Sequence, residues 1–328
     1  MLEYIGVHVD DAKFVAQTDE LEKEFVEKFN GLLKTSGSGI CDEFLKTRII
    51  QTKDYVSFDQ TAKIVNYCKE FQVTKPLKNF EMDIQEIMKD TRKFSDQKRY
   101  QSAIGGLLYI AGSYRPDILT AVGQLATFNN SPNESAWRAI VRLYGFLLET
   151  KDLKLVYNKM DSNDDKMKIE IYVDANFNDP HLKNKSRSGY LIFVNNCLVT
   201  WYSKKQSLLA LSTEEAEVFA ANEAAKSVAW LLNLLNELNI EYHMPIMHED
   251  CNNAIIWINE KKNSMRTKHF HLRLQFIRDM VENNQLKVQY VNTNDNAADM
   301  MTKTVGKNKH ALFSKQIGLR NINSEEVL

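Results

Sequence analysis

The sequence lacks most features that would mark a special class of protein. Its 328 residues include four cysteines, none of them in a CxxC pair or at metal-finger spacing, so they predict neither a disulfide framework nor a zinc site. No apolar run reaches the roughly 18 to 20 residues that cross a bilayer. The N-terminus also lacks the basic and apolar segments of a signal peptide. We therefore expect a soluble, intracellular protein that makes no membrane contact.

An excess of charge of either sign is also missing. The chain carries 42 basic and 43 acidic side chains, for a formal net charge of -1. This balance neither indicates nor excludes a nucleic-acid partner, because a basic face can lie opposite an acidic site. With 44% hydrophobic residues, the chain is long enough for one or two globular domains.

The first half of the chain combines short strands with helices. Apolar residues alternate in its strand-like segments and recur at helical spacing elsewhere, and a polar run from about Lys75 to Lys98 indicates a connection. In chain order, we predict a strand pair at 3–15 with a turn at Val9–Asp11, a helix at 20–33, a hairpin at 44–58, a helix at 59–73 and three bundled helices at 99–150.

The second half follows a polar segment, residues 158–166, that has the composition of a linker. The element order there is three strands, helix, strand, helix, strand, helix, which indicates an α/β layered domain with a mixed sheet. We predict strands at 168–174, 188–195, 197–204, 244–250 and 286–291, and helices at 212–238, 252–260, 267–283 and 295–303.

Four acids stand at element ends in this second half. Asp174 closes the first strand, Asp250 ends the fourth, Glu217 lies one turn into the long helix, and Asp299 lies in the last helix. Strand ends and the following helix starts gather at one sheet edge, where clustered carboxylates need cations among them. Mg²⁺ or Mn²⁺ suits such oxygen ligands, and two ions about 4 Å apart promote phosphodiester hydrolysis. Taken singly, each acid is better explained as a cap, a turn residue or a solvated charge.

The motifs around these acids resemble the ribonuclease H domain at the end of the Pol polyprotein of copia-type (Pseudoviridae) long-terminal-repeat retrotransposons. The resemblance spans roughly residues 168–305 and rests on DA at 174, KSRSGY at 185, WYSKKQ at 201, LSTEEAE at 211, DCNN at 250, RTKH at 266 and ADMMTK at 298. One departure is Cys251, where the family more often has asparagine.

The resemblance implies an RNase H-like mixed five-stranded sheet with flanking helices. It also implies that Asp174, Glu217, Asp250 and Asp299 are the catalytic carboxylates and bind two Mg²⁺ ions, with Mn²⁺ as an alternative, and that an RNA/DNA hybrid is the partner. Glu214, Glu215 and Glu249 neighbour these acids, but helix and strand geometry point them in other directions.

The upstream region resembles the same polyprotein. The segment IGVHVDDAKFV is similar to the YVDD turn of a reverse transcriptase palm, and residues 99–119 are similar to the stretch between polymerase and ribonuclease H. Since the fingers and the first palm aspartate would precede Met1, we expect a truncated polymerase remnant at Asp10 and Asp11 without independent polymerase activity. The resulting division is a partial palm at 1–75, thumb or connection helices at 76–157, a linker at 158–167, the RNase H-like domain at 168–305 and a C-terminal tail at 306–328.

Basic and polar residues near the proposed site suggest contacts to nucleic acid. Residues 261–278 hold six Lys or Arg and no acid, which suits a phosphate track, although a basic helix face without a ligand is about equally common. For His269 and His271 a structural role is the simpler interpretation, and we expect Trp201 in the core. The predicted contact residues are Lys183, Lys185, Arg187, Ser188, Lys204, Lys205, Gln206, Arg266, Lys268 and His269.

Three hypotheses for function remain. The first is a metal-dependent endonuclease that cuts the RNA strand of RNA/DNA hybrids, encoded by a 5'-truncated retrotransposon and located in cytoplasmic virus-like particles or the nucleus. The second is a catalytically silent relic or co-opted fragment that binds nucleic acid, or pairs with a full-length reverse transcriptase or with a second copy of itself. It predicts hybrid binding without cleavage in Mg²⁺. The third is a decayed reading frame, which predicts an unstable or absent protein.

Overall fold

The second half of the chain forms the mixed sheet that the sequence predicts. A computed structural model describes residues 3–8, 11–16, 18–33, 43–44, 47–159, 166–260 and 270–322. In it, five strands lie in the order β11-β10-β7-β8-β9, with β7, β8 and β9 antiparallel and β10 parallel to both β7 and β11. Their bounds are β7 Ile169–Asp179, β8 Lys185–Val194, β9 Cys197–Lys205, β10 Ile246–Glu249 and β11 Lys287–Tyr290.

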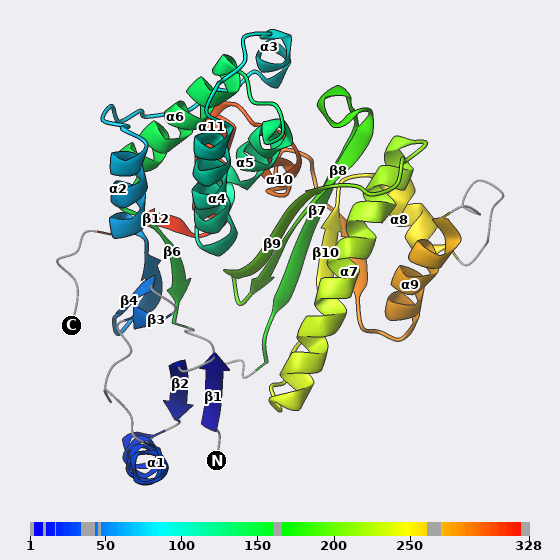
Figure 1. The fold of residues 1–328 in the computed structure, drawn as a ribbon. Coiled ribbons are helices and arrows are strands. Elements are labelled where there is room, and N and C mark those ends of the chain that lie inside the picture. Colours follow the sequence, from blue (N-terminus) through cyan, green and yellow to red (C-terminus); the bar gives the residue numbers. More distant parts are fainter. Residues whose placement is uncertain are drawn as a thin grey trace.

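Helices cover both faces of this sheet (Figure 1). Ile171 and Val173 of β7 join the core beneath α7, whereas the alternate residue Tyr172 packs with the α10 and α11 side. This alternation is the strand period of two. The helices are α7 Thr213–Glu237, α8 Asn252–Asn259, α9 His271–Glu282, α10 Asp299–Thr302 and α11 Lys307–Gln316. The predicted α/β fold class is therefore confirmed, with element bounds within a few residues of those expected.

A helical bundle precedes the sheet, as predicted. Its core combines residues from the helices α2 to α6, including the fully buried Ile104, Leu107 and Ile140. Asp96 and Asn133 cap α4 and α6 by accepting backbone N–H groups. The segment expected to be a plain connection contains the short helix α3. The elements are α2 Thr61–Glu70, α3 Ile84–Lys89, α4 Gln97–Ser113, η1 Pro116–Ile118, α5 Leu119–Leu125, η2 Ala126–Phe128 and α6 Glu134–Glu149.

A second sheet joins distant parts of the chain. Its antiparallel order is β12-β6-β5-β4-β3, with β3 at Glu43–Phe44, β4 at Thr47–Gln51, β5 at Tyr55–Asp59, β6 at Leu153–Asn158 and β12 at Leu319–Asn321. The sequence predicted a tail after residue 305, yet α11 and β12 form there because Phe313, Ile317 and Leu319 are buried in the core. The C-terminal segment thus pairs with the strand that follows the bundle.

The bundle and the RNase H-like sheet pack directly against each other. Trp201 Nε1 donates to the carbonyl of Ala111 at 3.0 Å, and Thr120 Oγ1 donates to the carbonyl of Met300 at 2.6 Å. Trp201 is partly buried against the core, as expected. Within the predicted linker, residues 160–165 lie outside the described residues.

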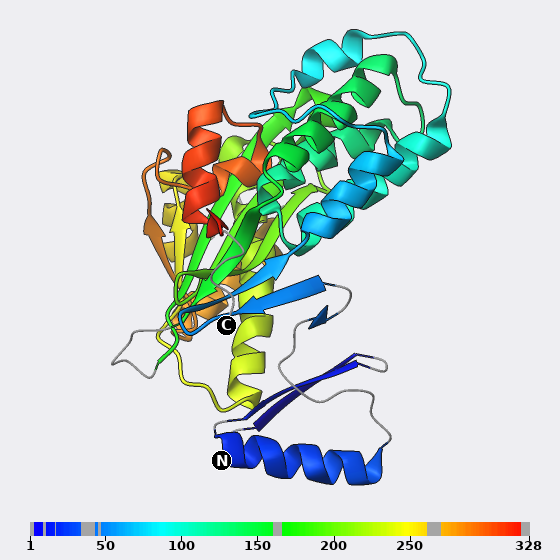
Figure 2. The ribbon, with the colours of Figure 1, turned by 90° about the vertical axis from the view of Figure 1, so that its left-hand side faces the viewer.

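The N-terminal hairpin is peripheral. β1 (Glu3–His8) and β2 (Asp11–Ala16) pair antiparallel, and α1 (Asp19–Leu32) follows with no buried residue. Both ribbon views place this unit at one end of the molecule (Figures 1 and 2), where the Tyr4 hydroxyl donates to the carbonyl of Leu238, just after α7, at 2.9 Å. Val9 and Asp10 lie outside the described residues, and Asp11 is described only as the first residue of β2. Within the described part of the chain, no helix is long and apolar enough to cross a membrane.

Candidate metal centre

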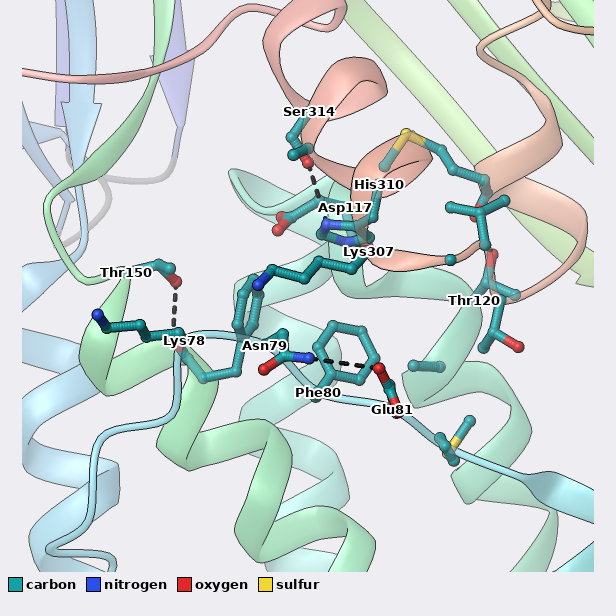
Figure 3. Close-up of a pocket in the computed structure, with 18 of the residues that line it drawn as sticks. Lys78, Asn79, Phe80, Glu81, Asp117, Thr120, Thr150, Lys307, His310 and Ser314 are labelled. Carbon is teal, nitrogen blue, oxygen red and sulfur yellow. Dashed lines mark hydrogen bonds between the residues drawn. The ribbon is translucent and has the colours of Figure 1, made fainter.

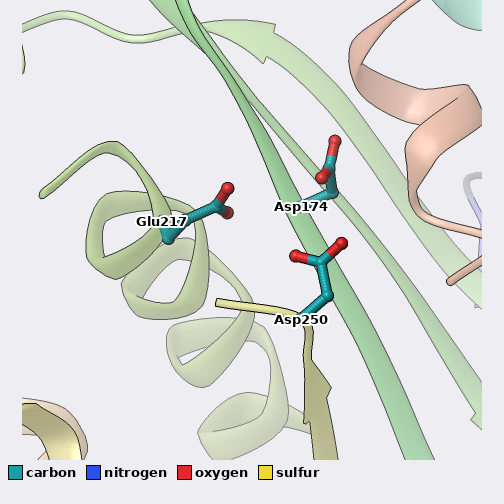
Figure 4. A group of neighbouring side chains, drawn as sticks. All are labelled: Asp174, Glu217 and Asp250. Carbon is teal, nitrogen blue, oxygen red and sulfur yellow. The ribbon is translucent and has the colours of Figure 1, made fainter. Parts of the chain in front are cut away.

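Three of the four predicted acids meet beside the end of β10 (Figure 4). Asp174 does not close its strand as predicted, because β7 continues past it to Asp179 by pairing with β8, whereas Asp250 directly follows the last residue of β10. Oxygen atoms of Asp174, Glu217 and Asp250 all lie within 4.8 Å of one another. The sheet register explains why Asp174 and Asp250 lie close together. Strands β7 and β10 run parallel, with Tyr172 opposite His248, so Asp174 and Asp250, each two residues further along, are also neighbours. Glu217 arrives from the first turns of α7, which Ser212 caps by accepting the backbone N–H of Glu215.

Burial raises the pKa values of two acids in the cluster. Asp174 and Glu217 are only 3% and 4% exposed. Burial raises the pKa of Asp174 to about 6, against a lowering by Lys303 and by the Thr302 hydroxyl, which donates to Asp174. Burial, followed by the neighbouring carboxylates of Glu249 and Asp174, raises the pKa of Glu217 well above its usual range.

This environment fits a divalent cation. Glu217 Oε2 is buried and has no hydrogen-bond partner among the described residues, and leaving a buried carboxylate oxygen unpaired is costly. The available ligands are all carboxylate oxygens, the type that Mg²⁺ and Mn²⁺ prefer. A bound cation would both complete the missing contact and offset the mutual repulsion of the three acids.

Asp299 stands beside this cluster but is engaged elsewhere. It is the first residue of α10, and its carboxylate forms ion pairs with Lys303, at 2.7 Å, and with Lys309 of α11. Its charge is still close enough to raise the pKa of Asp174. The geometry therefore separates a three-acid cluster from a lysine-paired Asp299, and the role of Asp299 as a metal ligand stays a prediction.

Glu249 is a buried acid beside the cluster. It faces the other side of β10 from Asp250, as expected, but α7 covers that side, so Glu249 is fully buried and close enough to Glu217 to raise the pKa of Glu217. Its Oε1 accepts the backbone N–H of Cys251 at 2.9 Å, and its Oε2 has no partner among the described residues. Burial raises its pKa well above the usual range. The sequence could have predicted this burial, because Glu249 lies two residues after Met247 and so shares its face of the strand, and Met247 is a core residue.

Glu214 and Glu215 are held away from the cluster, as expected. Glu214 accepts a hydrogen bond from the Asn253 side chain at 3.1 Å, and Glu215 accepts the backbone N–H of Leu211 at 2.8 Å. Both acids therefore have local structural partners.

The predicted nucleic-acid contacts divide into exposed and buried residues. Lys183, Lys204 and Lys205 are exposed and Lys185 is partly exposed. Burial lowers the pKa of Lys205, and the positive charges of Lys185 and Lys183 lower it further. These three lysines therefore lie close together. Lys183, Lys185 and Lys205 form one basic surface, which we call the lysine surface. Lys204 points to the opposite face of β9, where its Nζ lies 5.4 Å from the centre of the Tyr202 ring.

Arg187, Ser188 and Gln206 do not reach that surface, and their predicted contact role is corrected here. Arg187 is 2% exposed, because β8 is an interior strand and its guanidinium lies against Gly123 and Ser203. The Gln206 amide donates to the Ser188 hydroxyl and to a backbone carbonyl. These residues hold the ends of β8 and β9 in place. Arg266, Lys268 and His269 lie outside the described residues.

The sheet order, the covering helix and the acids that meet between the middle of β7, the end of β10 and the first turns of α7 define an RNase H-like α/β domain. No family model matches the chain. Its relatives are the Pol polyproteins of copia-type retrotransposons, and the chain belongs to this family.

These relatives include Pol polyproteins from plants. The Retrovirus-related Pol polyprotein from transposon TNT 1-94 of Nicotiana tabacum is 36% identical over 225 residues, which are 68% of this chain and 16% of the relative. The corresponding polyprotein from transposon RE2 of Arabidopsis thaliana is 29% identical over 228 residues, 69% of this chain and 15% of the relative. The chain thus spans about a sixth of the length of these relatives.

A solved structure, LC11-RNase H1 in complex with an RNA/DNA hybrid, is also similar. It is 15% identical and covers 41% of this chain and 94% of its own, with a TM-score of 0.32.

Proposed function

We propose that this chain is a metal-dependent ribonuclease that hydrolyses the RNA strand of RNA/DNA hybrids in the context of a retrotransposon Pol protein. The observation that carries the proposal is the cluster of Asp174, Glu217 and Asp250, in which Asp174 and Glu217 are buried and one Glu217 oxygen has no hydrogen-bond partner among the described residues. Membership in the Pol polyprotein family supports the choice of nucleic acid over other phosphate esters.

Each part of the site has a distinct task in this proposal. Asp174, Glu217 and Asp250 would hold Mg²⁺ or Mn²⁺, and such ions activate water and stabilise the leaving oxygen of a phosphodiester. The Thr302 hydroxyl of α10 holds the Asp174 carboxylate, and the charge of Lys303 favours its ionised form. Because the carboxylates are already gathered, and Asp174 and Glu217 are already buried, little reorganisation is needed when the ions bind.

The lysine surface would hold the hybrid by its phosphates. Contacts of this kind position a duplex without reading its sequence, and recognition of the RNA strand then rests on its 2'-hydroxyl groups and the shape of the minor groove. The proposal assigns no polymerase step to Asp10 and Asp11. It places the protein where reverse transcription occurs, in cytoplasmic particles or the nucleus.

The test is cleavage of end-labelled RNA in an RNA/DNA hybrid, in Mg²⁺, in Mn²⁺ and in EDTA. Asp250→Asn removes a cluster carboxylate, and Glu214→Gln is the matched control because it changes a nearby acid that is paired with Asn253. We expect metal-dependent cleavage of the hybrid by the wild type and Glu214→Gln, none by Asp250→Asn, and none of double-stranded DNA.

The same assay discriminates the second hypothesis. A folded wild-type protein that binds the hybrid but leaves its RNA intact in both metals would contradict the ribonuclease proposal. That result would favour a nucleic-acid-binding relic.

A further inference from the structure

A cavity of about 730 Å³ lies between the helical bundle and the last two helices of the chain. Residues 78–83, which precede α3, form one side (Figure 3). Part of α6 and the segment from α10 to α11 form the others. Its volume falls within the range of roughly 300 to 1,000 Å³ typical of small-molecule sites. It is separate from the carboxylate cluster, because none of the three acids lines it.

Unpaired cations surround this cavity. Lys78, Arg142, Lys307 and Lys315 line it, and none of the four forms an ion pair with another described residue. They come from three segments that are far apart in sequence, so the fold gathers them against their mutual repulsion.

The acids in the lining are largely committed to other partners. Asp117 forms a buried ion pair with Arg115 at 2.8 Å, and the Asp83 carboxylate caps α3 by accepting the N–H groups of Gln85 and Glu86. Glu81 accepts a hydrogen bond from the Asn79 side chain. The cavity therefore presents net positive charge, which favours an anionic ligand.

Aromatic rings form part of the wall. The ring centroids of Phe80 and Phe146 are 5.0 Å apart, and His310 packs edge-on to both at 5.6 and 5.7 Å. The His310 ring is fixed by a 3.0 Å hydrogen bond between Nε2 and the carbonyl of Asp117. Such a surface is suited to stacking against a planar base, and base–aromatic stacking tolerates any base because every base has a π-face.

The cavity is coupled to the metal centre through one short segment. Lys303 lines the cavity while its Nζ binds Asp299 Oδ1 at 2.7 Å. Thr302, the residue before it, donates to the Asp174 carboxylate. A ligand in the cavity would therefore lie next to the residues that hold the catalytic acids.

From these observations we infer that the cavity binds a nucleotide that carries a 5'-phosphate, with the phosphate among Lys78, Arg142 and Lys307 and the base against Phe80. The ligand is either a free mononucleotide or the 5'-phosphorylated end of an RNA strand. The second source rests on the proposed function, because hydrolysis by such a metal centre leaves a 5'-phosphate on the downstream product.

Calorimetric titration of the full chain in EDTA tests this inference without any hydrolysis. The probes are adenosine 5'-monophosphate, adenosine, inorganic phosphate, and an RNA tetramer with and without a 5'-phosphate. We expect the monophosphate to bind at least about tenfold more tightly than adenosine or phosphate, since it alone uses both the charged and the aromatic parts of the wall.

Substitutions at exposed positions test the location of the site. Arg142→Gln and Lys307→Gln should each weaken monophosphate binding by about tenfold through loss of a charge-assisted contact. Lys287→Gln, an exposed lysine on β11 at the far edge of the mixed sheet, should leave binding unchanged. If the phosphorylated tetramer binds as well as the mononucleotide, the ligand is a strand end, and if it does not bind, the ligand is the free nucleotide.

The inference is overturned if the monophosphate does not bind at millimolar concentration, if adenosine or phosphate binds equally well, or if the two variants bind like the wild type. These outcomes are independent of cleavage. Failure of the ribonuclease assay with intact monophosphate binding would refute the proposed function alone, and the reverse pattern would refute the cavity site alone.

Discussion

Replacing Asp174 by asparagine should stabilise the metal-free protein at neutral pH. Burial raises the folded-state pKa of this carboxyl from 3.8 to about 6. An acid with a raised folded pKa contributes stability that is fully present below its unfolded pKa and is lost as the pH rises through the folded pKa. The penalty therefore develops between about pH 3.8 and pH 6, and the neutral asparagine avoids it.

The size of the effect follows from the two pKa values. A difference of about two corresponds to about 3 kcal/mol, since one pKa unit is worth about 1.4 kcal/mol. The Asp174 side chain is almost completely buried, so solvent screening reduces this value little. Loss of its charge also relieves the carboxylate of Glu217, whose pKa Asp174 helps to raise. Asparagine can still accept the hydrogen bond from Thr302 through its amide oxygen.

Urea unfolding in EDTA measures the prediction. At pH 7.5 the free energy of unfolding of Asp174→Asn should exceed that of the wild type by about 3 kcal/mol, and at pH 4.2 by less than about 1 kcal/mol. Saturating Mg²⁺ should stabilise the wild type more than the variant, because the variant lacks one carboxylate ligand. An equal or lower stability of the variant at pH 7.5 in EDTA, or a difference that does not change with pH, would refute this account of the site.

Three further predictions concern other parts of the structure. Glu249→Gln should raise the metal-free free energy of unfolding at pH 8 more than at pH 5, because burial raises the pKa of Glu249; identical pH profiles in urea unfolding would contradict this. The double variant Lys183→Gln/Lys205→Gln should weaken hybrid binding and reduce the slope of log affinity against log salt by about 1 to 2, measured by fluorescence anisotropy, and an unchanged slope would exclude the lysine surface as the contact. Trp201→Phe removes the hydrogen bond to Ala111 and should cost about 1 kcal/mol in urea unfolding, whereas no loss would show that the contact between bundle and sheet does not depend on it.

Local patterns predicted most of the RNase H-like domain because its elements are regular. The alternation in β7 and the long helical pattern of α7 depend only on residues close in sequence. The turn between β8 and β9 is local as well, because Asn195 and Asn196 have φ angles of 50° and 62°, which suit a two-residue hairpin. The convergence of Asp174 and Asp250 was predicted from the rule that strand ends share an edge, although β7 continues past Asp174 to Asp179 and only β10 stops next to its acid.

The errors arose where partners are distant in sequence. β12 exists because Leu319 pairs with Leu155 of β6, a contact that no local pattern reveals. Arg187 lies in a polar segment with the composition of a surface turn, but Gly123 of α5 packs against its guanidinium and Arg187 is buried. The pairing of Asp299 with Lys309 likewise depends on α11, which was not predicted.

The most direct test of the central claim is anomalous diffraction from crystals of the wild-type protein soaked in Mn²⁺. We predict anomalous density between the carboxylates of Asp174, Glu217 and Asp250, with none in Asp250→Asn crystals treated in the same way. Mn²⁺ bound only elsewhere, or no density at the three acids in wild-type crystals, would contradict the assignment of this cluster as the metal centre.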